Sequence, residues 1–210
     1  MHQANASSNL LVLGTAQDGG YPHTGCSEDC CREAWKDSNQ KRLIASLAVL
    51  DGKDCFLVDI TPDFKYQLQL IERHINEKPR ISGICITHAH LGHYMGLLEL
   101  GLEVMNTNDI PVYVMPKMKS FLENNAPFTQ LLELNNIRLL ALQDNYPIDI
   151  FKDVKITPFQ VPHRNEYSET VGYRIQSSHH SVIYIPDIDS WDRWDTDINE
   201  LIKESDIALL

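Results

Sequence analysis

The sequence predicts a layered α/β fold. Its 210 residues are 43% hydrophobic and 22% charged, which is enough apolar content for a substantial core. Short apolar runs that end at turn residues alternate with segments of helical periodicity, a pattern typical of sheets covered by helices. No low-complexity linker or obvious repeat divides residues 1–210, so we expect a single domain.

The individual elements follow from periodicity and turn residues. Apolar runs separated by Gly, Pro, Asn or Asp predict strands, and apolar residues recurring every three to four positions predict helices. The predicted strands are 9–15, 43–50, 55–60, 84–86, 110–115, 137–142, 154–161, 170–175, 182–187 and 207–210. The predicted helices are 62–76, 95–100, 117–125, 128–134 and 189–204, and within the last we expect Trp194 and Ile198 to face the core.

Three histidines follow the apolar run 84–86. His88 and His90 are two residues apart, so in extended chain their side chains point the same way. His93 lies on the turn into the next helix and can fold back beside them. Neutral imidazole is a common ligand for zinc, iron, copper and nickel, so this segment predicts a metal site rather than three ordinary polar loop residues.

Other candidate side chains lie where predicted strands end. Asp59 ends an apolar strand and is well placed to brace a metal-site histidine, a role compatible with that of an ordinary turn aspartate. His163 and Asp187 each lie just past the end of a strand. His179 and His180 fall at a hairpin tip, where we expect solvated turn residues.

The cysteines divide into two kinds. Two lie inside apolar strands, at 55 and 85, and are expected to be inert core residues. Cys26, Cys30 and Cys31 lie within six positions of one loop and could hold a structural metal with one more ligand, such as His23 or a group from elsewhere. The alternative is three unrelated free thiols.

The overall charge excludes some partners. A formal net charge of −11 argues against nucleic-acid binding, which requires a basic face, and against anionic membranes. No apolar run approaches the ~20 residues of a membrane helix. Residues 1–9 are polar and lack the apolar core of a signal peptide, so we expect a cytoplasmic protein, with an exported form whose leader was removed left open.

His-x-His-x-x-His after a strand resembles the metallo-β-lactamase superfamily, whose usual motif is His-x-His-x-Asp-His. The order of elements over residues 10–210 is similar as well. This resemblance implies an αββα sandwich, with two facing mixed β-sheets, outer helices and metals along one sheet edge. It implies metal ligands at His88, His90, His93, His163 and Asp187, and catalytic roles for Asp187 and Asp59.

Within that superfamily, the opening LGTAQDGGYP at residues 13–22 and the cysteine cluster after it resemble the coenzyme PQQ biosynthesis protein B group. The same features are similar to phosphodiesterases related to RNase Z, some of which carry a cysteine-based structural zinc. True lactamases are less similar.

Two departures from the family pattern affect the expected metals. Gly92 stands where the family has the Asp that holds a second metal. The family's final His ligand should come after Leu210, so the domain is expected to lack its C-terminal end. One firm zinc site is therefore expected at His88, His90 and His163, with iron or manganese as alternatives. The second site is expected to be weak, because only His93 and Asp187 remain for it.

The predicted function is metal-dependent hydrolysis. A three-histidine site with an open position lowers the pKa of bound water to about 7, and the resulting hydroxide would attack an ester or phosphodiester. Asp187 would orient that water, and Asp59 would fix a histidine. The substrate is expected to be a small molecule or small anionic ester, which Arg164 could meet unless it is an ordinary surface arginine.

Two alternatives remain open from the sequence. One is a role in PQQ biosynthesis, oxidative or as a carrier, because histidines plus a carboxylate also suit non-haem iron. The other is a degenerate, non-catalytic metal-binding module, motivated by Gly92 and the missing last ligand. The sequence determines neither the substrate nor the oligomeric state.

Overall fold

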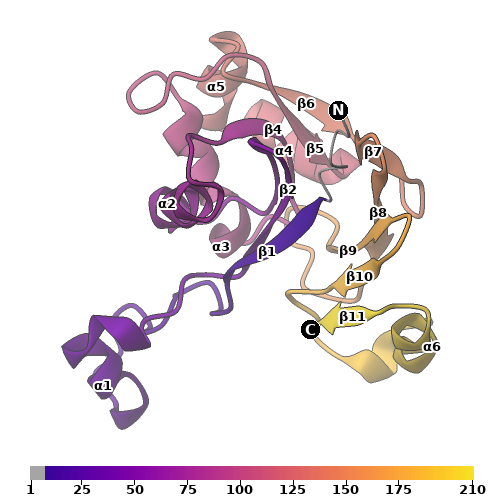
Figure 1. The fold of residues 1–210 in the computed structure, drawn as a ribbon, viewed down its shortest axis with the longest axis horizontal. Helices are drawn as coiled ribbons and strands as arrows, with labels where there is room; N and C mark the ends of the chain where they lie inside the picture. Colours follow the sequence, from indigo (N-terminus) through magenta and orange to yellow (C-terminus); the bar gives the residue numbers. More distant parts are fainter. Residues whose placement is uncertain (1–7) are drawn as a thin grey trace, which may run out of the picture.

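Two facing β-sheets with helices on both outer sides confirm the predicted α/β sandwich in the computed structural model, which describes residues 8–210 (Figure 1). Residues 1–7, which form most of the polar stretch used to predict the location, lie outside the described residues. Within the described part of the chain, no helix is both long and apolar enough to cross a membrane.

Both sheets are mixed. In the first, with strand order β1-β2-β3-β4-β5-β6, the pairs β1/β2 and β2/β3 are antiparallel and the remaining pairs are parallel. In the second, with order β11-β10-β9-β8-β7, only β10/β11 is parallel. The first sheet comprises β1 (Asn9–Gly14), β2 (Ser46–Asp51), β3 (Asp54–Val58), β4 (Arg80–Cys85), β5 (Ile110–Val114) and β6 (Ile137–Ala141). The second comprises β7 (Ile148–Phe151), β8 (Val154–Gln160), β9 (Val171–Ser177), β10 (Ser181–Tyr184) and β11 (Ile207–Leu209).

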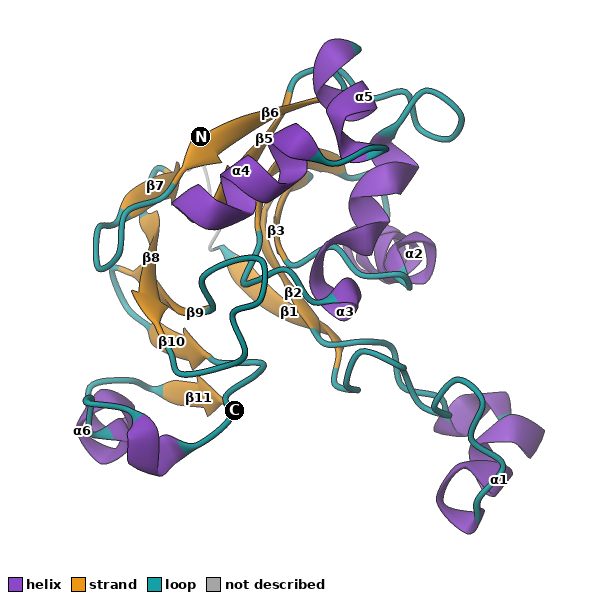
Figure 2. Cartoon of the chain, turned by 180° about the vertical axis from the view of Figure 1, so that it is seen from behind, coloured by secondary structure: helices purple, strands orange, loops and turns teal. Residues whose placement is uncertain are grey.

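Helices cover the outer faces of both sheets, as Figure 2 shows from behind. The first sheet is covered by α2 (Phe64–Ile75), α3 (Leu91–Tyr94), the 3₁₀ turn η2 (Met95–Leu100), α4 (Pro116–Asn124) and α5 (Phe128–Glu133). The second is covered by η3 (Trp191–Arg193) and α6 (Ile198–Lys203). The remaining elements, α1 (Asp29–Lys36) and η1 (Ser38–Gln40), lie on an arm described below. Neither α1 nor β7 was among the predicted elements.

Side chains alternate between two cores along the central strands. On β2, Leu47 and Val49 belong to the core between the sheets, whereas Ala48 and Leu50 belong to the core under the helices. This alternation follows from the two-residue repeat of a strand. Both faces of β2 are therefore apolar, which explains why its sequence is continuously hydrophobic.

The single helix predicted over residues 189–204 is wrong. The chain forms η3, breaks, and starts α6 after Asp197, whose carboxylate accepts a hydrogen bond from the backbone N–H of Asn199 and caps the new helix. Trp194 and Ile198 pack against the small core around Phe159, as predicted.

Residues 15–45 form an arm that leaves the sandwich after β1 and returns at β2; we call it the cysteine arm. Its two sides are joined by isolated bridges between Ala16 and Ile44 and between Tyr21 and Arg42. Figures 1 and 2 show α1 at its far end, well away from both sheets. The root of the arm therefore lies beside the sheets, whereas its tip depends on its own local contacts.

Candidate metal centre

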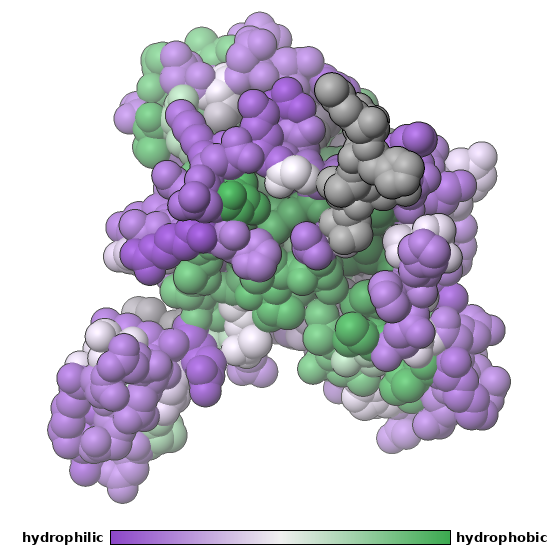
Figure 3. Space-filling model, in the orientation of Figure 1, coloured by the Kyte–Doolittle hydropathy of each residue, from purple (hydrophilic) through white to green (hydrophobic). Residues whose placement is uncertain are grey.

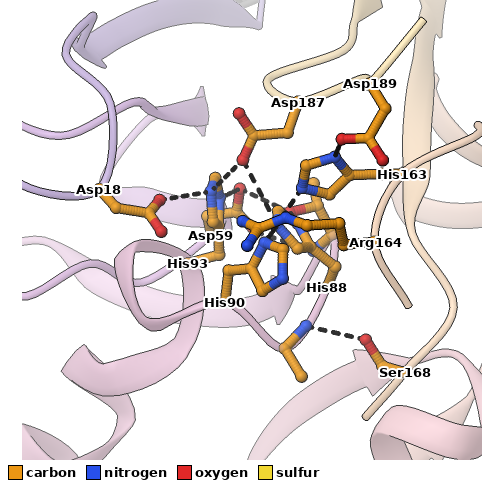
Figure 4. A network of polar contacts seen from close by, with 12 residues as sticks. Asp18, Asp59, His88, His90, His93, His163, Arg164, Ser168, Asp187 and Asp189 are labelled. Atoms are coloured by element: carbon orange, nitrogen blue, oxygen red, sulfur yellow. Dashed lines mark hydrogen bonds and ion pairs between the residues drawn. The ribbon is translucent and has the colours of Figure 1, made fainter. Parts of the chain in front are cut away.

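The predicted ligands meet where strands of both sheets end (Figure 4). One local motif supplies His88, His90 and His93, and the packing of the two sheets brings Asp59, His163 and Asp187 to it. The contributing segments are the exits of β3 (Asp59), β4 (His88, His90), β8 (His163) and β10 (Asp187), together with helix α3 (His93).

Asp59 has an unusual backbone conformation that aims its carboxylate inward. Its φ of 64° lies in the left-handed region, which non-glycine residues rarely adopt. The fully buried carboxylate accepts hydrogen bonds from the backbone N–H of Thr87, at 2.8 Å, and from its hydroxyl, at 3.0 Å. It also lies 2.7 Å from Nδ1 of His93. Asp59 thus orients a histidine from behind, the role the sequence suggested for it.

Four donor atoms form the first group, which comprises His88, His90, His163 and Asp187. Nδ1 of His90 lies 2.9 Å from Nε2 of His88 and 3.0 Å from Nε2 of His163. Oδ2 of Asp187 lies 3.4 Å from Nε2 of His88. Nitrogen ligands about 2.0 Å from a tetrahedral zinc lie about 3.3 Å from one another, so these spacings fit one coordination sphere.

The outward nitrogens of two rings are held by carboxylates. Nδ1 of His163 lies 2.7 Å from Asp189, and Nε2 of His90 lies 3.2 Å from Glu166. When both rings donate their N–H outward, lone pairs alone face each other across the 3.0 Å between them. Two lone pairs form no hydrogen bond, whereas a cation between them would satisfy both. The donor set therefore fits a metal.

A second group consists of His93, Asp187 and Asp18. Nε2 of His93 lies 3.0 Å from Oδ2 of Asp187 and 3.2 Å from Oδ1 of Asp18. Asp187 belongs to both groups, which is the position of a bridging ligand. Asp18 comes from the loop after β1 and was not predicted as a site residue; the missing carboxylate at Gly92 was the signal that could have prompted a search for it.

Burial and neighbouring charges set the protonation of the centre. Burial lowers the pKa of His88 to about 4, so its ring is neutral at pH 7. Burial also opposes charge on His93, but Asp59, Asp18 and Asp187 outweigh it and raise the pKa of His93 well above its usual value. Burial alone would raise the pKa of Asp187, but hydrogen bonds from His88 and His93 hold it far below its usual value. The pocket around His93 thus requires a positive charge, either a proton or a metal.

The family described as "Beta-lactamase superfamily domain" matches residues 55–210. The chain belongs to the β-lactamase superfamily. This match covers all of the histidine motif and both later ligands, and it confirms the resemblance drawn from the sequence.

Curated proteins and solved structures are similar to this chain. A "Coenzyme PQQ synthesis protein B" from Xanthomonas campestris pv. campestris is 27% identical over 198 residues, covering 84% of this chain and 64% of that protein. The structure of Zn(2+)-bound PqqB from Methylobacterium extorquens has a TM-score of 0.74 at 22% identity, covering 89% and 68%. A diphosphatase from the PhnP family has a TM-score of 0.61 at 24% identity, covering 84% and 63%. The chain thus spans about 64% of the length of the first curated relatives.

The loop after β8, whose residues 164–169 were expected from the sequence to shape the cleft, also contacts the histidine motif. Ser168 accepts a hydrogen bond through its Oγ from the backbone N–H of Ala89, at 2.8 Å, inside the histidine motif. Arg164 is 63% exposed, and its guanidinium lies 3.9 Å from Glu166. In Figure 4 its side chain extends across the front of the histidine rings. The loop after β8 therefore supplies His163, a hydrogen-bond anchor and a cationic group at the same place.

A cavity of about 500 Å³ adjoins the second group of this superfamily site. Its polar side is formed by His93 and Asp187, and its walls include Val12, Leu47 and Leu209. Figure 3 shows apolar side chains gathered on the face of the sandwich and a mostly hydrophilic surface on the arm. The volume is that of a small-molecule site.

The cysteine cluster lies apart from this centre, on the arm. Sγ of Cys30 lies 3.8 Å from Sγ of Cys26 and 3.9 Å from Sγ of Cys31. Thiolates about 2.3 Å from a tetrahedral zinc lie about 3.8 Å apart, so these distances suit a metal. Hydrogen bonds with the two neighbouring thiols raise the pKa of Cys30 to about 11, so without a cation this thiol stays protonated.

His23 is not brought to the cysteine cluster as a ring ligand. Its Nδ1 lies 2.9 Å from the carbonyl oxygen of Thr24, and its ring packs against Gly19. Only its backbone N–H reaches the cluster, donating to Sγ of Cys31 at 3.4 Å. The hairpin residue His180 is likewise remote from the metal centre: it is 77% exposed and lies 3.8 Å from Asp206.

Proposed function

We propose that this chain carries the metal site of a hydrolase that cleaves an ester or phosphodiester, with zinc as the metal. The observation that supports this most directly is the group of four donors, whose spacings fit a zinc coordination sphere. A solved structural neighbour named as Zn(2+)-bound PqqB, and another named as a diphosphatase, add support. The alternative of a degenerate module, motivated by Gly92 and the missing last ligand, predicts a folded protein without activity in any metal.

Each residue of the proposed site has its own role in hydrolysis. Zinc held by His88, His90 and His163 would act as a Lewis acid and lower the pKa of water to about 7. Asp187, ionised at neutral pH, can orient the attacking water by accepting a hydrogen bond from it, and the proton that the water loses goes to solvent. Hydrolysis consumes one water: its oxygen bonds to carbon or phosphorus, the ester bond breaks, and the leaving alcohol takes up a proton.

We propose a small anionic ester as the substrate. The cavity of about 500 Å³ beside His93 and Asp187 has room for its remaining atoms. Arg164 lies 3.9 Å from Glu166, the carboxylate beside His90, so it brings a positive charge to this side of the centre in a chain of net charge −11. Guanidinium pairs well with phosphate or carboxylate. The same net charge disfavours a nucleic acid as substrate.

The test compares two histidines of the same chain. Zinc-loaded wild-type protein should hydrolyse bis(p-nitrophenyl) phosphate or p-nitrophenyl acetate, and His90→Ala should lose that activity together with about one equivalent of zinc. His180→Ala, at the exposed hairpin tip, should retain both. Absence of turnover in the wild type, or equal turnover in the two variants, would overturn the hydrolase.

A role in PQQ synthesis is the second candidate, supported by the relatives called "Coenzyme PQQ synthesis protein B", which are 24–31% identical to this chain. Three imidazoles and a carboxylate also suit non-haem iron. Two measurements on protein purified without added metal distinguish PQQ synthesis from hydrolysis: elemental analysis and oxygen uptake. Bound iron with oxygen consumption favours this second function, and bound zinc with hydrolysis favours the first.

We further propose a structural zinc at Cys26, Cys30 and Cys31, supported by the sulfur spacings, with the fourth ligand not identified. We also propose a cytoplasmic location. It is supported by the five free cysteines, because unpaired thiols are typical of a reducing compartment.

A further inference from the structure

Gly92 and Asp18 compete for the same space. A Cβ atom built on Gly92 would lie 2.4 Å from Oδ1 and 2.8 Å from Cα of Asp18. No side chain fits at position 92 while the loop after β1 stays where it is. The carboxylate of Asp18 therefore occupies the position into which a side chain at 92 would extend.

The loop places Asp18 there by its own hydrogen bonds. The backbone N–H of Gly20 donates to the carbonyl oxygen of Gln17, at 2.8 Å, which closes a turn with Asp18 at its second position. The backbone N–H groups of Thr15 and Ala16 both donate to the carbonyl oxygen of Leu43, at 2.9 Å, and fix the root of the arm to the chain that leads into β2. These hydrogen bonds fix the backbone on both sides of Asp18.

Its carboxylate points at the second group of donors. Oδ1 of Asp18 lies 3.2 Å from Nε2 of His93, which in turn lies 3.0 Å from Oδ2 of Asp187. Nδ1 of His93 is already occupied by Asp59, at 2.7 Å, so Nε2 is the nitrogen that remains for a metal. Asp18 itself is 35% exposed, so a cation can reach this group from solvent.

We propose that Asp18, contributed by the loop after β1, replaces the absent carboxylate at position 92 and holds a second divalent cation together with Nε2 of His93 and Oδ2 of Asp187. This inference rests on the proposed metal centre and corrects the expectation that only two donors remain for the second cation. One imidazole and two carboxylates make a harder donor set than the first group, so this position accepts Mn²⁺ or Fe²⁺ more readily than the first does.

The experiment measures metal binding rather than activity. Zinc-loaded protein is titrated with Mn²⁺, and free Mn²⁺ is followed by electron paramagnetic resonance. We expect wild type to bind one Mn²⁺ beside the retained zinc, and Asp18→Asn, which keeps the shape but loses the charge, to bind it at least ~10-fold more weakly. The matched control is Asp153→Asn, in the exposed turn between β7 and β8, which should behave as wild type.

A second variant changes none of the three donor residues. Gly92→Ala adds a methyl group where Asp18 now lies, so it should displace that carboxylate and weaken Mn²⁺ binding to a similar degree while His90-dependent zinc is retained. Equal Mn²⁺ affinity in wild type and Asp18→Asn overturns the proposal, and so does a wild type that binds no Mn²⁺. A failure of the proposed hydrolase appears differently, as Mn²⁺ binding without turnover.

Discussion

The histidine centre and the cysteine cluster are two candidate metal sites built in opposite ways. Ligands of the centre come from several strand exits and a helix, and two of them, His88 and His93, are buried. Carboxylates hold His93 and His163 from behind. The cysteines lie within one short segment at the tip of an arm, and Cys30 is exposed. The sandwich therefore pre-forms the centre, whereas a metal on the arm would have to stabilise the local fold that holds it.

If the centre depends on shared ligands, the largest effect should come from Asp187, which belongs to both groups. We expect Asp187→Asn to lower hydrolysis more than ~100-fold, beyond the range for losing only a partner behind a ligand, because both cations lose an anionic donor. Elemental analysis should show less metal at the centre. Full metal content with normal turnover would show that the two groups do not share this carboxylate.

Pre-formation of the centre can be tested through Asp59, which touches no predicted substrate position. Asp59→Asn keeps a residue type that tolerates positive φ but removes the charge facing His93. We expect metal affinity to fall about 10–100-fold and the metal-free protein to lose about 3 kcal/mol of unfolding free energy. Zinc titration and urea denaturation measure these. An unchanged free energy of unfolding would mean that the contact between Asp59 and His93 does not stabilise the metal-free fold.

The separation of the arm's tip from the centre predicts a smaller effect. Cys30→Ser should remove the metal bound at the arm, and with it one equivalent of zinc, while turnover changes less than about 2-fold because the centre keeps all its donors. Ser27→Ala, in the same loop, serves as the control. A large loss of activity in Cys30→Ser would instead show that the arm and the centre are coupled.

A last prediction, which concerns stability only outside the neutral pH range, is about thiol ionisation. Burial raises the pKa of Cys55 to about 12, so at pH 8.5 its thiolate fraction is about 10³-fold below that of an ordinary thiol. Iodoacetamide should therefore spare Cys55 until the chain unfolds. Because the unfolded thiol ionises first, its contribution to stability is present below about pH 9 and is lost as the pH rises toward 12. Peptide mass spectrometry reads out the labelling, and early labelling of Cys55 would contradict the burial.

Much of the fold could be predicted because short-range patterns encode it. Short apolar runs bounded by turn residues predicted nearly all the strands. The two-residue spacing of His88 and His90 predicted that their side chains point the same way. The helix predicted over residues 189–204 failed because periodicity could not show that Asp197 would cap a new helix there. Asp189, the first residue of the predicted helix, lies instead in the loop before η3, where its carboxylate is 2.7 Å from Nδ1 of His163.

The sequence by itself determined the layered α/β class, the residue types at the strand exits and the absence of a side chain at position 92. Only the tertiary structure decided that Asp18 lies in the space left by Gly92 and that His163 faces His90. The physical reason is that backbone conformation follows from neighbouring residues, whereas contacts between distant loops depend on how two sheets pack and which loops their edges bring together.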